Sequence, residues 1–178
     1  MLTVRRVTKE DPAAAAVSRI NEEAFPPAER IPLDEMLAYG EKADAAVWGF
    51  FEDALPAGFA LTLRNGRCVY ISYFAIRADL RGRGLGGEAL RLLLRQFPDR
   101  QPVLDMEPPD PEAENHVQRE RRRAFYLRNG FRETGRFTML RGIRYAVLCA
   151  GETLDAEGFA GLVRLNHLLE PDYSEILY

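Results

Sequence analysis

The sequence lacks long hydrophobic runs and has very little cysteine. No apolar stretch approaches the ~20 residues of a transmembrane helix, and the amino terminus, Met1–Val7, has no long apolar core like that of a secretory signal. The two cysteines, Cys68 and Cys149, lie in strand-like apolar segments, where buried free thiols are expected rather than a disulfide. We therefore expect a cytoplasmic protein with no membrane partner.

An excess of basic charge is also missing. The 178 residues include 24 Lys and Arg against 27 Asp and Glu, a formal net charge of −3. Nucleic-acid-binding domains usually carry a strong basic excess, so the sequence predicts no nucleic-acid partner. Hydrophobic residues make up 47% and charged residues 29%, which is typical of a globular domain rather than a disordered chain.

Apolar periodicity and breaker residues predict alternating strands and helices. Asn65-Gly66 is a strong hairpin signal, and Gly40 is expected to end the second helix. A crossover helix before the fifth strand makes that strand parallel to the fourth. The expected fold is one α/β (α+β) domain with a mixed, mostly antiparallel sheet of about six or seven strands. Strands are expected at 2–7, 45–52, 58–63, 69–76, 102–107, 131–137 and 144–149, and helices at 13–23, 33–39, 87–97, 112–128 and 155–169.

A glycine-rich turn, Arg81–Gly87, joins the strand that ends at Ile76 to the next helix. Glycines let successive backbone N–H groups point into one concavity, because no Cβ prevents a positive φ or the close approach of a ligand. The following helix adds unpaired N–H groups and the positive end of its dipole. Arg81 and Arg83 add positive charge. The turn therefore predicts a phosphate-binding site, the alternative being an ordinary tight turn between strand and helix.

A dinucleotide-binding fold is a second interpretation of the same turn. Gly82, Gly84 and Gly87 fit the spacing G-x-G-x-x-G, and Asp105 follows about 20 residues later. A Rossmann fold, however, needs several parallel β-α units after the fingerprint, and only one further strand is expected here before the final hairpin. The Gly-Lys-Ser/Thr of a P-loop is also absent from the turn. Both nucleotide-binding folds are therefore disfavoured.

Two segments together resemble the GNAT superfamily of acyl-CoA-dependent N-acetyltransferases. Phe74–Ile76 followed by Arg81–Gly86 is similar to its acyl-CoA motif, and Phe125–Phe131 is similar to its Tyr…Gly-Phe segment on the last core helix. The expected order of strands and helices agrees as well. The resemblance implies a GNAT-like domain over 1–150, with a splayed parallel strand pair at the acyl-CoA site, and 151–178 as a C-terminal helix and tail packed on the same domain.

The resemblance implies an enzyme that transfers an acetyl group from acetyl-CoA to a primary amine by direct attack. The glycine turn would bind the pyrophosphate, the strand end would pair with the pantetheine, and a backbone N–H near Ile76 would polarise the thioester carbonyl. The alternative is a non-catalytic acyl-CoA-binding module with a regulatory role. The implied cofactor-binding residues are Phe74, Ala75, Ile76, Arg81, Gly82, Arg83, Gly84, Leu85, Gly86 and Gly87.

Four side chains are implied for the chemistry and for the acceptor. Tyr126 matches the general acid that protonates the departing CoA thiolate, the alternative being an aromatic packing role. Glu107 is the first candidate for the general base, and Asp105 is second because it shares the same side-chain parity; capping of the proline-rich loop is the alternative. Glu29, in the loop between the first two helices, is a candidate acceptor-binding residue or a solvated surface glutamate.

The arginine-rich helix departs from the family pattern. Many members carry Asn and a small residue where Arg119 and Arg122 stand, so the CoA contacts of this helix are left open, and the run is expected to be mostly a solvated face. His116 and His167 lack metal-ligand spacing, so no metal is expected. The acceptor is expected to be a small-molecule or protein amine, and acidic residues near the expected site favour a cationic one. A homodimer is possible.

Overall fold

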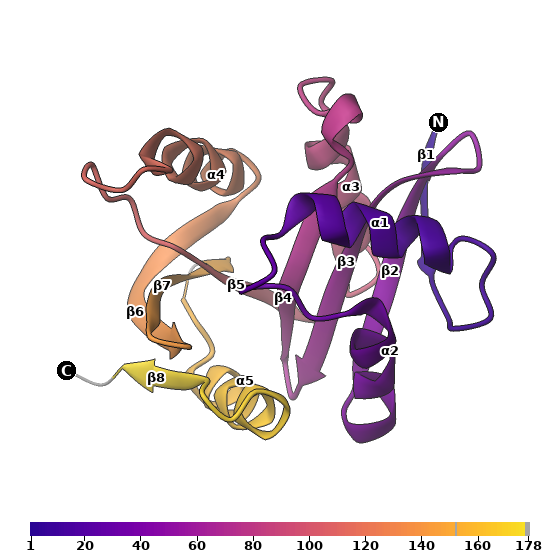
Figure 1. Ribbon diagram of the computed structural model, residues 1–178. Coiled ribbons are helices and arrows are strands. Elements are labelled where there is room, and N and C mark those ends of the chain that lie inside the picture. Colours follow the sequence, from indigo (N-terminus) through magenta and orange to yellow (C-terminus); the bar gives the residue numbers. More distant parts are fainter. Residues whose placement is uncertain (152, 177–178) are drawn as a thin grey trace. The chain divides into compact units, whose positions relative to one another are not determined.

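Residues 1–151 and 153–176 are described by a computed structural model, in which they form five α-helices, one short 3₁₀ helix and eight strands (Figure 1). The strands are β1 (Leu2–Arg6), β2 (Ala45–Glu52), β3 (Leu55–Asn65), β4 (Cys68–Ile76), β5 (Gln101–Met106), β6 (Phe131–Leu140), β7 (Ile143–Ala150) and β8 (Ser174–Ile176). The helices are α1 (Ala14–Ala24), α2 (Leu33–Lys42), η1 (Ala78–Leu80), α3 (Leu85–Leu94), α4 (His116–Arg128) and α5 (Ala156–Leu169).

The strands form one mixed sheet in the order β1-β2-β3-β4-β5-β7-β6-β8. β4 and β5 run parallel, with residues 68–70 opposite residues 101–103. The pairs β1–β2, β2–β3, β5–β7, β6–β7 and β6–β8 are antiparallel. A helical crossover between β4 and β5 accounts for the parallel pair, because only a long connection returns the chain in the same direction. The predicted mixed, mostly antiparallel sheet is confirmed.

The final strand, β8, is not among the strands predicted from the sequence. β8 is only three residues long, and it pairs with Phe137, Thr138 and Met139 of β6. A segment this short carries too little apolar alternation to be recognised from sequence.

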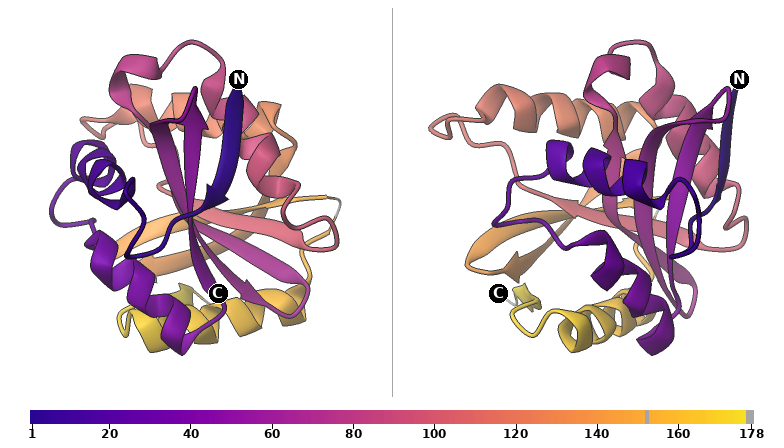
Figure 2. Two further views of the ribbon diagram at one scale, coloured as in Figure 1. Left: turned by 90° about the vertical axis from the view of Figure 1, so that its right-hand side faces the viewer. Right: turned by 45° about the vertical axis from the view of Figure 1, so that its right-hand side comes forward.

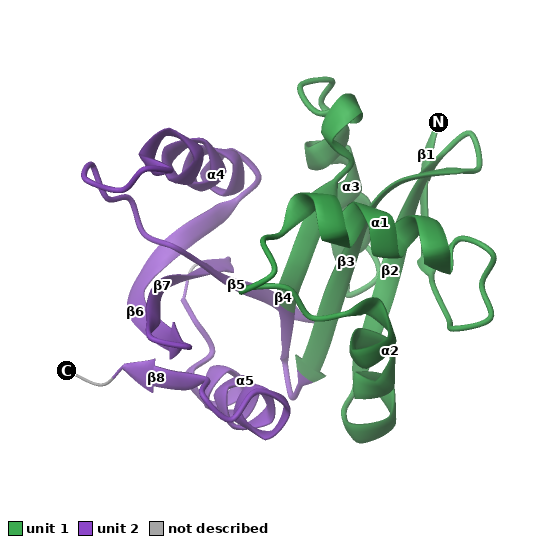
Figure 3. Cartoon of the chain, in the orientation of Figure 1, with its two compact units in different colours: residues 1–64, 71–98 green, residues 65–70, 99–178 purple. Residues whose placement is uncertain are grey.

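The chain forms two compact units (Figure 3). Unit 1 consists of residues 1–64 and 71–98, and unit 2 consists of residues 65–70 and 99–178. β3 and β4 contribute residues to both units. The division of the chain after residue 150, expected from the family resemblance, stays a prediction.

In unit 1, α1 and α2 lie on one face of β2 and β3, and α3 lies on the other (Figure 2). Both faces of these strands are therefore covered, which explains why β2 and β3 read as continuous apolar runs rather than as alternating ones. Each large apolar side chain buried here contributes about 2 kcal/mol. Fully buried side chains of this unit include Val17, Met36, Phe50, Phe59, Leu61, Leu90 and Leu93.

The predicted end of the second helix at Gly40 is wrong. α2 continues to Lys42, and the N–H of Ala43 still donates to the Tyr39 carbonyl at 2.8 Å. A glycine inside a helix costs only about 1 kcal/mol relative to alanine. Burial of the Tyr39 side chain, 4% exposed, offsets such a cost.

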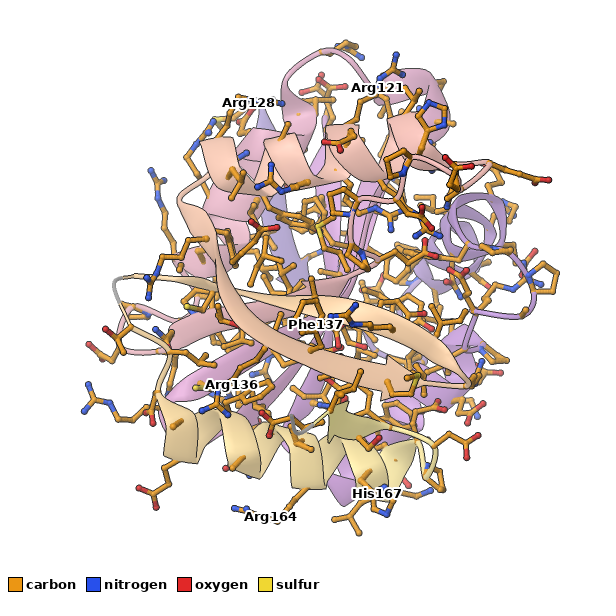
Figure 4. The ribbon with its side chains drawn as sticks, turned by 90° about the vertical axis from the view of Figure 1, so that its left-hand side faces the viewer. Arg121, Arg128, Arg136, Phe137, Arg164 and His167 are labelled. Carbon is orange, nitrogen blue, oxygen red and sulfur yellow. The ribbon has the colours of Figure 1, made fainter. Side chains whose placement is uncertain are left out.

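In unit 2, α4 and α5 lie on opposite sides of β6 (Figure 4). α4 begins at His116 rather than at Glu112, because Asp110 accepts the Glu112 N–H at 3.0 Å and the chain first forms a separate turn. α5 is capped by Asp155, whose carboxylate accepts the Gly158 N–H at 3.0 Å.

α5 packs very closely against the beginning of β4 and the end of β3. A Cβ on Gly158 would lie 2.6 Å from the Cys68 sulfur, and one on Gly161 would lie 2.3 Å from the Asn65 side-chain oxygen. Both cysteines are buried as free thiols, as the sequence predicts. No helix in the described ranges is both long and apolar enough to cross a membrane.

Candidate active site

The glycine turn at the start of α3 has open backbone geometry. Gly82 has φ +77° and Gly84 has φ +81°, and a Cβ at either position would meet no heavy atom within 4 Å. Gly84 is the N-cap of α3 and provides no side-chain hydrogen bond to it. The first N–H groups of α3 therefore remain available to a ligand, which fits an anionic group such as a pyrophosphate.

The two arginines of the turn already have partners inside unit 1. The Arg81 Nε donates to the Ile76 carbonyl oxygen at 3.0 Å, which ties the turn to the end of β4. The Arg83 guanidinium lies 3.4 Å from the Glu52 carboxylate and is 55% exposed. Arg81 thus shapes the turn, while the exposed Arg83 remains the better placed of the two to reorient toward an anion.

The end of β4, where the pantetheine is expected to bind, lies unusually close to β3. A Cβ on Gly58 would lie 2.3 Å from the Ala75 carbonyl oxygen, so only glycine fits there. The Arg77 N–H donates to the Ala57 carbonyl at 2.8 Å beside this contact. Ala75 and Ile76 are almost fully buried, and Phe74 packs edge-on against Phe50 at 5.6 Å between ring centroids. Sequence analysis missed the role of Gly58, although a glycine inside a strand is a signal of close backbone approach.

The loop that carries Glu29 is anchored at two points. The backbone carbonyl of Glu29 accepts a hydrogen bond from the Tyr73 hydroxyl of β4 at 2.6 Å. The Asn21 side chain of α1 donates to the Ile31 carbonyl at 2.8 Å. The loop is therefore held in unit 1 by its backbone, while Glu29 itself is only half-buried.

Tyr126 lies on α4 in unit 2, between two aromatic rings. Its ring packs edge-on against Phe125 and Phe131 at 5.1 Å and 5.6 Å between centroids. Burial raises the pKa of Tyr126 to about 12; Arg122 opposes this shift and the charge of Asp105 adds to it. The hydroxyl has no hydrogen-bond partner among the described residues. It is not fully enclosed, because the one enclosed polar side-chain atom without a partner in the described ranges is the Asn21 Oδ1. It is thus a protonated donor with a free direction.

Glu107 follows directly after β5 and is committed to an ion pair. Its carboxylate accepts from the Arg119 guanidinium at 2.7 Å and from the Asn115 side chain at 3.3 Å. The Glu107 and Arg119 side chains are 12% and 17% exposed. Arg119 also donates to the Asn115 side-chain oxygen at 2.7 Å, which fixes the arrangement. Arg119 is thus inside unit 2, in contrast to the solvated face expected for the arginine run, whereas Arg121 and Arg128 point away from β6 (Figure 4).

Asp105, the second candidate base, has a different environment. Its carboxylate accepts hydrogen bonds from Tyr70 at 2.7 Å, Thr138 at 2.6 Å and Tyr173 at 2.9 Å. Burial raises the pKa of Asp105, and the three hydroxyl donors oppose that shift. Sequence analysis missed these three partners, which come from β4, from β6 and from the segment after α5. In the sequence, strand parity pointed to Asp105 as a base, and its spacing from the glycine turn pointed to it only in the disfavoured dinucleotide-binding interpretation.

The predicted site residues fall in both units. The glycine turn, the end of β4 and Glu29 belong to unit 1, and Glu107, Asp105 and Tyr126 belong to unit 2. In the described part of the chain, no group of three or more His, Cys, Asp or Glu side chains is arranged to hold a metal ion.

Comparisons with known proteins point to one family. No curated protein sequence matches the chain. Among solved structures, a putative GNAT acetyltransferase from Bacteroides thetaiotaomicron is 25% identical, with a TM-score of 0.75 over 92% of this chain and 94% of that one.

Two further structures share the fold at lower identity. The ribosomal-protein-S18-alanine N-acetyltransferase from Escherichia coli is 17% identical, with a TM-score of 0.62 over 88% of this chain and 97% of that one. A GNAT acetyltransferase from Elizabethkingia anophelis, solved with acetyl-CoA bound, is 12% identical, with a TM-score of 0.58 over 85% and 98% of the two chains. The sequence model of the Acetyltransferase (GNAT) family matches residues 14–131, so the chain belongs to the GNAT family of acetyltransferases.

Proposed function

We propose that the protein transfers an acetyl group from acetyl-CoA to a primary amine, by direct attack and without a covalent enzyme intermediate. The observation that carries the proposal is the open glycine turn, where positive φ values at Gly82 and Gly84 leave the first N–H groups of α3 accessible. Such an array suits a pyrophosphate, since backbone N–H groups and the helix dipole both favour anions. Both cysteines are buried, which agrees with direct transfer.

Tyr126 is proposed as the general acid. When the amine nitrogen bonds to the thioester carbon and the carbon–sulfur bond breaks, the electron pair goes to sulfur, and the Tyr126 hydroxyl supplies its proton. With a pKa raised to about 12, the phenol is protonated at neutral pH. Burial that disfavours a phenolate also disfavours a thiolate in the same surroundings, so the two groups remain close enough in acidity for proton transfer.

Glu107 is proposed as the general base, acting directly or through a water molecule. Its ion pair with Arg119 at 2.7 Å orients the carboxylate, and a carboxylate oxygen is the atom that would accept the proton. Glu29 is proposed to contact the acceptor from its anchored loop. We further propose that the reaction takes place in the cytoplasm and that the acceptor is a free amine or a protein amine.

A non-catalytic acyl-CoA-binding module is the second candidate function. The observation that favours it is the same ion pair, because Arg119 and Asn115 already donate to the two carboxylate oxygens of Glu107. In such a module the glycine turn would bind acyl-CoA and Tyr126 would serve only in packing.

Acetyl-CoA consumption with a panel of primary amines distinguishes the two functions. The enzyme is expected to turn over at least one amine, and Tyr126→Phe is expected to lose turnover while keeping its affinity for acetyl-CoA. Glu107→Gln should lower kcat, whereas the matched variant Glu112→Gln, at an exposed loop position, should not. Binding of acetyl-CoA without turnover of any amine would establish the module. Failure to bind acetyl-CoA would refute both.

A further inference from the structure

The loop of residues 25–32, which joins α1 to α2, is fixed through its backbone. The hydroxyl of Tyr73 on β4 donates to the Glu29 carbonyl at 2.6 Å. The side-chain amide of Asn21 on α1 donates to the Ile31 carbonyl at 2.8 Å. All of these residues belong to unit 1. Two links, one to the sheet and one to a helix, therefore set the path of the loop.

The Tyr73 link is short and largely shielded from water. Tyr73 is 8% exposed, and its ring packs edge-on against Phe25 at 4.9 Å between centroids. Phe25 also packs edge-on against Phe59 of β3 at 6.3 Å. Because these rings already fix the phenol, its hydrogen bond to the loop costs little further side-chain entropy. In such surroundings the hydrogen bond is also electrostatically stronger than in water.

The Asn21 link holds the loop at a cost to stability. Asn21 is 1% exposed, and its Oδ1 is enclosed without a hydrogen-bond partner in the described ranges. A buried acceptor without a partner is unfavourable, and an apolar side chain of similar size would avoid that cost. The link at the Ile31 carbonyl is therefore better explained by where it places the loop than by a gain in stability.

The two links leave the Glu29 side chain available to a ligand. They hold the loop by carbonyl oxygens, and the Glu29 carboxylate forms no hydrogen bond or ion pair with any residue that the structure describes. The side chain is half-buried. A carboxylate on a fixed backbone contacts a cationic amine at a smaller entropic cost than one on a loop that must be ordered during binding.

Tyr73 connects this loop to the strand on which the donor is expected to lie. It stands three residues before Ile76, at the end of β4 where the pantetheine is expected to bind. Its neighbour Phe74 points to the opposite face of the strand, where it packs against Phe50. The Tyr73 hydroxyl therefore fixes the distance between the loop and the end of β4, and all of these residues lie within unit 1.

We propose that Tyr73 is a positioning residue for the acceptor amine: its hydroxyl holds the Glu29 carbonyl and thereby fixes the Glu29 carboxylate relative to the end of β4. This inference rests on the proposed function, which it deepens by adding a residue that acts on acceptor binding through Glu29. The donor site does not depend on this hydroxyl, because the glycine turn is tied to β4 by Arg81 instead.

The test is Tyr73→Phe, which removes the hydroxyl and keeps the ring. The KM for n-butylamine, and for the panel amine with the highest kcat/KM, should rise about 3- to 10-fold, the range of one hydrogen bond. The values of kcat and of the acetyl-CoA Kd should stay within about twofold. The matched variant Tyr39→Phe removes a hydroxyl from another buried tyrosine of unit 1 and should leave all three constants within about twofold.

A double-mutant cycle distinguishes positioning from a merely structural role. If Tyr73 acts through Glu29, Tyr73→Phe should change the KM for the amine by less than about twofold in a protein that already carries Glu29→Gln. A structural role predicts the same factor with and without Glu29→Gln, and that result would overturn the inference.

The remaining outcomes separate the inference from the proposed function. An unchanged KM in Tyr73→Phe would overturn the inference while leaving acetyl transfer intact. If Tyr73→Phe does not fold, Asn21→Leu takes its place, since it releases the second link and should raise the same KM. Absence of turnover with every amine in the wild type would refute the proposed function and, with it, the role of Tyr73.

Discussion

The glycine turn of unit 1 and the Asp105 cluster of unit 2, which consists of Asp105, Tyr70, Thr138 and Tyr173, arrange their polar groups in opposite ways. The turn uses backbone N–H groups of consecutive residues, and its side chains are either absent or paired elsewhere. The cluster uses four side chains from segments far apart in the sequence. A backbone site depends on conformation and on the absence of a Cβ, whereas a side-chain site depends on single oxygen atoms.

The largest expected effect tests the backbone site. Gly84→Val should weaken acetyl-CoA binding by about 1,000-fold, since a branched residue at φ +81° forces the turn to change and removes several hydrogen bonds to charged oxygens. Calorimetric titration with acetyl-CoA measures the change. Gly142→Val is the matched control, because Gly142 has φ +78° and equally open surroundings in the β6–β7 turn. Equal losses of affinity in both variants would show that strain, not the site, is responsible.

A smaller but still large effect is expected for the general acid. Tyr126→Phe should lower kcat by about 100-fold and leave the acetyl-CoA Kd within about threefold. Because the pKa of Tyr126 is raised to about 12, wild-type kcat should not fall through loss of this proton below about pH 10. Steady-state rates across that range provide the measurement. A kcat unchanged by the substitution would assign Tyr126 to packing.

The third prediction compares the arginine of the Glu107 ion pair with an exposed arginine on the same helix. Arg119→Met leaves Glu107, 12% exposed, without its cation and should lower the free energy of unfolding by about 3 kcal/mol. Urea denaturation measures this loss. Arg121→Met, at an exposed position of the same helix, should change stability by less than about 0.5 kcal/mol. Similar losses in both variants would mean that the ion pair contributes nothing particular.

The smallest expected effect is a change in the pH dependence of stability. Burial raises the pKa of Asp105 above its ordinary value, so the folded protein retains this proton to higher pH than the unfolded chain does. Its contribution to stability is complete below the unfolded pKa and is lost as pH rises through the folded one. The groups that face it are Tyr70, Thr138 and Tyr173, together with the charge-coupled Tyr126. Asp105→Asn should remove this slope, and an identical slope in both proteins would contradict the shift.

Local patterns in the sequence predict most of the fold. The glycine turn, the hairpin at Gly66 and the positive φ of Gly130 after α4 each depend on neighbouring residues alone, so they are visible in the chain. Helix α2 passes Gly40 because packing of distant residues outweighs a local preference. β8 is missed because three residues show no pattern of their own, and its pairing partner lies more than thirty residues earlier.

The candidate site is only partly predictable from the sequence. Its backbone part, the glycine turn, is easier to predict than the contacts between its side chains. Motifs point to the turn and to Tyr126, whose roles stay predictions. The partners of the side chains are not visible in sequence: Arg119 reaches back to Glu107, and Tyr173 is 68 residues from Asp105. A hydrogen bond across such a separation depends on the completed sheet, so no pattern of neighbouring residues predicts it.

The place of Tyr173, directly after α5, has a consequence for how such enzymes diversify. The family model matches residues 14–131, whereas Thr138 and Tyr173 both lie beyond the matched segment. Substitutions after this point can remove or add donors around Asp105 while every residue of the glycine turn stays the same. In evolutionary terms, the hydrogen-bond environment of Asp105 is free to drift with the C-terminal segment while the turn is inherited unchanged.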